Sequence, residues 1–189
     1  ASGNIPECWN NSEGTTTTAS YKWVYNNSGH DAAPCVRFDS YNNSSENTNF
    51  LKTPNVAVTE NAIVNFWYKN PAGGDFSVYV STDGGATYTT ELATGLTNQA
   101  DWAEITIEIP SSVVGNNIVF VFKGTSNYGS GDAYIYLDDI TISEISAYTM
   151  SSSGDDIVEN TIDFGTVKNN SATKTFTIKN EGANDLQGI

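Results

Sequence analysis

Two adjacent acids interrupt a strand-like stretch at residues 133–142, which reads Ala-Tyr-Ile-Tyr-Leu-Asp-Asp-Ile-Thr-Ile. An ionised carboxylate inside an apolar strand is costly unless a partner compensates its charge. A bound cation is one such partner, and calcium takes about six to eight oxygen ligands. Asp138 and Asp139 are therefore predicted to bind a structural calcium ion. The alternative is that one acid faces solvent while the other caps a bend of the strand.

Aromatic residues in polar loops are the second group that could do chemistry, because aromatic rings stack on the apolar faces of sugars. Four such residues lie among Asn, Ser, Thr and Gly, and are predicted either to bind a ligand or to close an end of the fold: Trp23, Tyr25, Tyr41 and Tyr128. Trp67 and Trp102 lie in strand-like stretches instead. These two tryptophans are predicted to be buried in the core.

Residues for catalysis are sparse. His30 is the only histidine, and one histidine cannot make the two-histidine zinc site of the metalloproteases. No Gly-x-Ser-x-Gly sequence is present to supply a nucleophile elbow. A Ser-His-Asp arrangement remains open from the sequence, but His30 is predicted to be an ordinary loop residue and the protein to be no enzyme.

The elements that would position these side chains are strands, since no stretch shows sustained helical periodicity. Residues 63–69 and 118–122 are apolar on both faces, which predicts strands covered on both sides. Residues 102–109 alternate strictly, and this pattern predicts that Thr106 and Glu108 face water. The fold class is predicted to be all-β.

Acids outnumber bases by 22 to 8, and the formal charge is −14. A surface of that sign repels nucleic acid and anionic lipid, so neither is a predicted partner. No apolar run is long enough to predict a membrane span. The sequence opens with Ala1-Ser2-Gly3-Asn4 and shows no signal peptide, as expected of a mature or excised chain.

Cys8 and Cys35 are the only cysteines. In a chain rich in Asn, Ser and Thr they are predicted to form a disulfide, and two free thiols are the alternative. A bridge closing a loop of about 27 residues would stabilise the fold by about 3–4 kcal/mol in the chain-entropy model. This interpretation predicts a secreted protein that is extracellular or lies at the cell surface.

The composition changes after Glu144, and a run of Ser, Gly and Asp predicts a linker at residues 147–160. Residues 1–146 then form a first domain. Residues 161–189 hold two predicted strands and a turn, which are too few to close a β domain. This tail is either cut short or packed on the first domain.

Five stretches in order resemble the cleaved-adhesin group of MAM-like jelly-roll domains. They are Asn49-Phe50-Leu51-Lys52-Thr53-Pro54, Val64-Asn65-Phe66-Trp67-Tyr68, Tyr79-Val80-Ser81-Thr82-Asp83-Gly84-Gly85, Trp102, and Leu137-Asp138-Asp139-Ile140, within about residues 8–143. The resemblance implies a two-sheet jelly-roll β-sandwich with a structural calcium near the last strand. Carried over by position, it supports Asp138 and Asp139 as ligands and adds Glu7 and Asp39.

Residues 163–182 resemble the opening of immunoglobulin-like repeats, which implies an incomplete immunoglobulin-like segment in a multidomain parent. The whole chain is predicted to be a non-catalytic, calcium-stabilised module for carbohydrate binding or surface adhesion. Its partner would be a glycan or an extracellular protein. Two alternatives stay open: a protein–protein adhesion module, and a passive accessory domain of a secreted protease or glycosidase.

Overall fold

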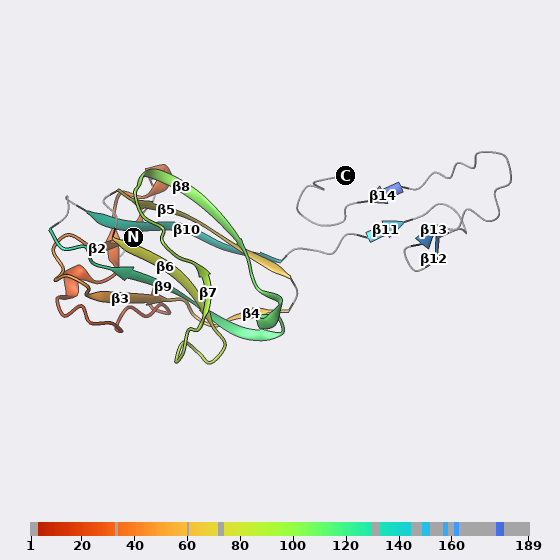
Figure 1. The fold of residues 1–189 in the computed structure, drawn as a ribbon, viewed down its shortest axis with the longest axis horizontal. Coiled ribbons are helices and arrows are strands. Elements are labelled where there is room, and N and C mark those ends of the chain that lie inside the picture. The colour runs from red at the N-terminus through yellow and green to blue at the C-terminus, as the bar shows by residue number, and fades with distance from the viewer. Residues whose placement is uncertain are drawn as a thin grey trace. The chain divides into compact units, whose positions relative to one another are not determined.

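The structure is a computed structural model, shown as a ribbon in Figure 1. It describes residues 4–32, 34–59, 61–71, 74–129 and 133–144, and then the strand residues 149–151, 157–158, 161–162 and 177–179. The chain divides into two compact units, Ala1–Glu144 and Ile145–Ile189.

The first unit is a sandwich of two antiparallel five-stranded sheets, whose layers are seen edge-on in Figure 1. One sheet has the order β1-β2-β10-β5-β8, formed by Val24–Asn26, Cys35–Asp39, Tyr134–Glu144, Ala62–Asn70 and Gln99–Glu108. The other has the order β3-β9-β6-β7, formed by Thr48–Lys52, Asn116–Thr125, Asp75–Ser81 and Thr90–Ala93, and β4 (Val56–Val58) also pairs with β9. The predicted two-sheet jelly-roll sandwich is confirmed.

Helical structure in the described residues is limited to three short 3-10 turns. They are η1 (Ala19–Tyr21), η2 (His30–Ala32) and η3 (Ser111–Val113). No helix within the described ranges is long and apolar enough to cross a membrane.

The two strands predicted to be covered on both faces differ in the structure. In β9 all five residues of 118–122 are buried, as predicted. In β5 burial alternates, with Val64 and Phe66 in the core and their neighbours half-buried on the outer face. The prediction for residues 63–69 is therefore wrong, because only one face of β5 packs against the second sheet.

The core between the sheets is dominated by aromatic side chains from both layers. Phe66 lies edge-on to Phe76 and Phe122, with ring centroids 6.2 and 5.7 Å apart. Such edge-to-face pairs add to the free energy gained from burying the rings. The same core receives Ile105 and Ile107 from β8, whose predicted alternation is confirmed.

The second unit contains two short antiparallel pairs within its described residues. β11 (Thr149–Ser151) pairs with β14 (Thr177–Lys179), and β12 (Ile157–Val158) pairs with β13 (Thr161–Ile162). β11 and β12 fall inside residues 147–160, the stretch predicted to be a linker. Most of the predicted immunoglobulin-like segment lies outside the described residues, so that assignment stays a prediction.

Candidate functional site

The outer face of the first sheet carries a group of aromatic side chains from three neighbouring strands. Tyr134 and Tyr136 come from β10, Trp67 from β5 and Trp102 from β8. All four are half-buried. The centroid of the Tyr136 ring lies 6.0 Å from those of Trp102 and Tyr134, at interplanar angles of 61° and 62°. The rings therefore form one connected aromatic surface.

A small open pocket lies on this surface, between the sheet and the loop that precedes η2. It has a volume of about 180 Å³ and is lined by Ser28, Gly29, Lys69, Trp102 and Tyr136. Sites for drug-sized ligands are larger, at about 300–1,000 Å³. The pocket combines two rings with an ammonium and a hydroxyl, so it suits one small polar ring such as a sugar unit.

His30 fixes the loop that forms one wall of this pocket. Its imidazole stacks on Trp67, with centroids 3.8 Å apart and an interplanar angle of 13°, and meets Trp102 edge-on at 6.0 Å. Its Nδ1 lies 3.1 Å from Oδ2 of Asp139. The prediction that His30 is an ordinary loop residue misses this role: His30 occupies the Trp67 ring and leaves Trp102 as the indole of the pocket.

The two adjacent acids of β10 sit at a bulge. The pairing of β10 with β5 shifts register after Asp138, and Asp139 has a φ of 48°. Asp138 is buried, and its carboxylate accepts hydrogen bonds of 2.9 Å from the backbone N–H groups of His30 and Asp139. Burial raises the pKa of Asp138 although both hydrogen bonds act to lower it. Asp139 is exposed, so this geometry matches the alternative of one bonded and one solvent-facing acid.

The prediction that Trp67 and Trp102 are buried in the core is wrong. Side chains two residues apart in a strand share a face. Trp67 therefore shares its face with Asn65 and Lys69, and Trp102 shares its face with Thr106 and Glu108, which were predicted to face water. The structure places both tryptophans on that outer face.

Trp23 lies in the core, unlike Trp67 and Trp102. It was predicted either to bind a ligand or to close an end of the fold, and its side chain is 0% exposed, which excludes the first alternative and fits the second. Its ring packs at 5.8 Å from both Phe38 and Phe76, and its Nε1 donates a 3.0 Å hydrogen bond to the carbonyl of Asn49. The ring therefore enters the core just before β1 begins, and a surface ligand cannot reach it.

The other three predicted ligand-binding aromatics do not line the Trp102 pocket. Tyr25 is half-buried and borders a different cavity. Tyr41 is half-buried, and its backbone N–H donates to the carbonyl of Ala133. Tyr128 is 62% exposed and is thus free to meet a ligand elsewhere.

Comparison with known families is decisive for residues 8–146, which match the MAM domain (meprin/A5/mu) family. The chain belongs to this family. The predicted relation to MAM-like, cleaved-adhesin domains is thereby confirmed. No curated protein sequence matches this MAM domain chain significantly.

Solved structures share the fold of this MAM domain. The K1 cleaved adhesin domain of Lys-gingipain from Porphyromonas gingivalis W83 aligns with a TM-score of 0.57 and 21% identity, over 75% of this chain and 93% of that one. The K3 domain of the same protein aligns with a TM-score of 0.56 and 23% identity, over 76% and 95%. TmCBM61 in complex with β-1,4-galactotriose aligns with a TM-score of 0.51 and 17% identity, over 75% and 91%.

The predicted calcium ligands of the MAM domain are not brought together. Asp39 pairs with Tyr134, four residues along β10 from Asp138, or about 13 Å in a strand. Its carboxylate accepts a hydrogen bond from the backbone N–H of Asn42 instead. Glu7 is exposed and does not line the cavity beside Asp138 and Asp139.

Within the described residues no three His, Cys, Asp or Glu side chains are grouped as metal ligands would be. Asp138 and Asp139 supply two carboxylates, both already hydrogen-bonded, whereas calcium takes about six to eight oxygens. Only Asp138 and Asp139 of the predicted ligands lie together in the described residues, so the candidate site is built without calcium.

Neither cysteine of the MAM domain forms the predicted disulfide. Cys8 is exposed, whereas Cys35 lies buried on β2 with its thiol 3.3 Å from the carbonyl of Ser28. Burial raises the pKa of Cys35 to about 12, which keeps it in the thiol form. The structure therefore matches the alternative of two free thiols.

A second cavity, of about 300 Å³, lies near the N-terminal segment of the MAM domain. It is lined mainly by apolar side chains, including those of Ile5, Leu51 and Leu137, with Trp9 and Tyr25. Its polar lining includes Asn4, Asp138 and Asp139, but both carboxylates already have hydrogen-bond partners, and an unpaired buried sugar hydroxyl is costly. We therefore take the smaller Trp102 pocket as the candidate site.

Proposed function

We propose that this MAM domain is a non-catalytic carbohydrate-binding module of an extracellular or cell-surface protein. The observation that carries the proposal is the pocket in which Trp102 and Tyr136 meet Lys69 and the Ser28-Gly29 loop. A sugar ring would place an apolar face on the indole and direct its hydroxyls to the polar groups around it.

The structural comparisons support this proposal at the level of fold. One similar structure is named for its complex with a β-1,4-linked galactotriose, and two others are named as adhesin domains. One fold can host many different functions, so the aromatic pocket supports the proposal more strongly than the shared sandwich fold does.

The proposal that the module is non-catalytic rests on the contacts of His30, the single histidine. The described contacts of the His30 imidazole are the ring of Trp67, the edge of Trp102 and the carboxylates of Asp31 and Asp139. No hydroxyl or thiol nucleophile is among those described contacts. This arrangement favours a structural use of His30 over a Ser-His-Asp triad.

Replacing Trp102 with alanine should weaken glycan binding by about tenfold or more, because it removes the ring on which the sugar would stack. The measurement is a glycan array on the purified chain, followed by titration of the best ligand into wild type and variant. Tyr128→Ala is the matched control, since Tyr128 is exposed and does not line the pocket. Equal losses in both variants would contradict the assignment of the pocket.

Protein–protein adhesion is the alternative function, and the adhesin names of two similar structures favour it. A blank glycan array together with saturable binding to an extracellular matrix protein would support adhesion. A blank array with no protein ligand would favour a passive accessory domain.

Calcium stabilisation stays a proposal carried over from the family resemblance. If calcium binds at Asp138 and Asp139, a chelator should lower the melting temperature of the wild type, and Asp139→Asn should abolish that difference. Thermal unfolding with calcium and with chelator measures both. Identical melting temperatures in the two conditions would show that the hydrogen bonds from His30 and Asp139 are sufficient to hold Asp138.

A further inference from the structure

We infer that the sugar bound at the Trp102 pocket carries an anionic group, a carboxylate or a sulfate, which Arg37 and Lys69 recognise. This inference rests on the proposed carbohydrate site and specifies its ligand. The strand register places the two cations on either side of one ring: Tyr136 is the direct partner of Arg37 on β2 and of Lys69 on β5. Arg37, Tyr136 and Lys69 therefore form one row across the outer face: Tyr136 and Lys69 line the pocket, and Arg37 lies next to it on the other side of Tyr136.

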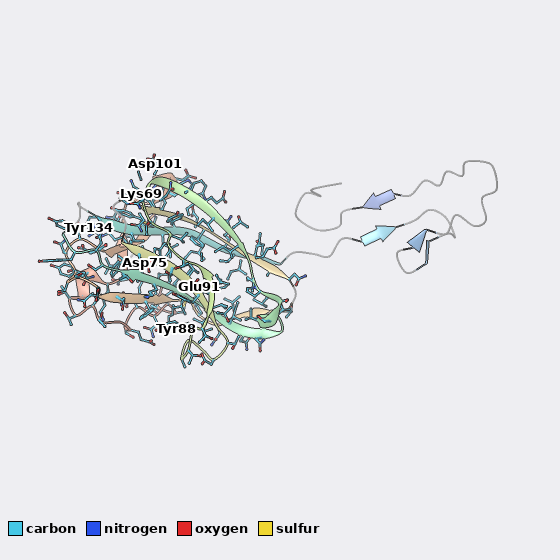
Figure 2. All side chains as sticks on the ribbon, in the orientation of Figure 1. Lys69, Asp75, Tyr88, Glu91, Asp101 and Tyr134 are labelled. Atoms are coloured by element: carbon cyan, nitrogen blue, oxygen red, sulfur yellow. The ribbon has the colours of Figure 1, made fainter. Side chains whose placement is uncertain are left out.

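The two cations are unusual because this chain has 22 acids and only 8 bases. Three contacts between a basic and an acidic side chain occur among the described residues: Lys52 with Glu13, and His30 with Asp31 and with Asp139, which are ion pairs only when the imidazole is protonated. Neither Arg37 nor Lys69 takes part in any of them. Figure 2 shows Lys69 and Asp101 toward the same end of the sandwich, yet no ion pair joins them.

The acids of the same face are engaged elsewhere. Glu104 accepts a 2.9 Å hydrogen bond from Asn65. Asp138 accepts hydrogen bonds from two backbone N–H groups, and Asp139 faces the imidazole of His30. Among the described residues of this face, no acidic side chain therefore balances the charges of Arg37 and Lys69.

One nitrogen of Arg37 is buried without a partner among the described residues, although the guanidinium also hydrogen-bonds the side chain of Tyr136. Its guanidinium carbon lies 4.3 Å from the centroid of Tyr134, and its Nε is buried without a hydrogen-bond partner in the described residues. Buried donors without partners are rare and call for an explanation such as a bound water or ion. The planar fork of an arginine matches a carboxylate or sulfate, and Lys69, whose Nζ lies 6.0 Å from the Tyr136 centroid, adds a second charge.

The net charge of −14 limits what kind of anion can bind. A long polyanion would be repelled by the rest of the surface. The pocket of about 180 Å³ also has room for one ring only. The inferred ligand is therefore a single acidic sugar unit, such as a uronic acid, a sialic acid or a sulfated hexose, at the end or branch of an otherwise neutral chain.

The test uses an array that prints each glycan in two forms, with and without its acidic unit, and includes carboxylated and sulfated members. Binding to the acidic forms should exceed binding to their neutral partners by about tenfold or more. Lys69→Gln and Arg37→Gln should each remove most of that preference. Arg37→Lys should retain part of it, because the charge stays while the fork is lost. Binding to the carboxylated members would identify the anion as a carboxylate, and binding to the sulfated members would identify it as a sulfate.

Lys123→Gln is the matched control, because it removes the same charge from the other sheet, where Lys123 pairs with Phe50 and Ser77. Thermal unfolding of each variant shows whether it folds. If Arg37→Gln does not fold, Lys69→Gln alone tests the inference. Equal binding to neutral and acidic forms, lost in Trp102→Ala, would overturn this inference and leave the proposed function standing. A loss of preference in Lys123→Gln as large as in Lys69→Gln would also overturn it. Absence of binding to every glycan would overturn both.

Discussion

Replacing Trp23 with alanine is expected to lower the free energy of unfolding by about 3–5 kcal/mol, the usual cost of truncating a buried aromatic residue. Trp23 is fully buried between the sheets, in contact with Phe38 and Phe76. The substitution also removes the hydrogen bond from the indole to the carbonyl of Asn49, which adds to the loss. Urea unfolding followed by far-ultraviolet circular dichroism measures the change.

Trp102→Ala is the matched control, since it makes the same chemical change on the outer face. Its ring is half-buried against Tyr136 and the edge of His30, so its removal should cost about 1 kcal/mol, as for substitutions away from the core. Trp23→Ala should thus mainly reduce stability, whereas Trp102→Ala should mainly reduce glycan binding. Similar destabilisation by both substitutions would contradict the burial assigned to Trp23.

Replacing Asn49 with alanine is expected to destabilise the fold by about 3 kcal/mol, because the Trp23 N–H and the Asn11 carbonyl lose the partner described for them and the Glu13 carbonyl keeps only its bond from the Phe50 N–H. The Asn49 side chain is fully buried. Its Oδ1 accepts a 2.8 Å hydrogen bond from the Trp23 N–H, and its Nδ2 donates to the carbonyls of Asn11 and Glu13 at 2.9 and 2.6 Å. This one amide thereby fixes the N-terminal segment and the entry of β1 against β3.

Asn65→Ala provides the comparison for Asn49. The Asn65 side chain also makes two hydrogen bonds, to Glu104 and Thr106, but it lies on the outer face where water can replace them. Its loss should change the free energy of unfolding by about 0.5 kcal/mol. If Asn49→Ala proves as mild as Asn65→Ala in the same urea titration, the amide is no anchor of the N-terminal segment.

The sandwich could be predicted from the sequence because its main signal is local. The alternation at residues 102–109 gave the inward face of β8 correctly, and the apolar run at 118–122 identified a buried strand. The same rule would have placed Trp67 and Trp102 outward, since each shares its phase with polar neighbours. Large aromatic residues in strands are usually buried, but here the phase of the strand decides the face on which each tryptophan lies.

The site itself could not be predicted from spacing along the chain. Arg37, Lys69 and Tyr136 are neighbours only because β10 lies between β2 and β5, an order that the jelly-roll topology sets. The two acids of β10 were correctly recognised as unusual in a strand. Their compensation comes from a bulge and from the backbone of His30, more than 100 residues away in sequence, and no local pattern encodes such a contact.

The most direct test of the carbohydrate site is a nuclear magnetic resonance titration that follows the indole N–H signals of the four tryptophans as the best glycan from the array is added. Each indole reports on a different place: Trp102 on the pocket, Trp67 on the His30 stack, Trp9 on the apolar cavity and Trp23 on the core. The account predicts that the Trp102 signal shifts most and the Trp23 signal stays in place. A shift confined to Trp9, with Trp102 unchanged at saturation, would contradict it.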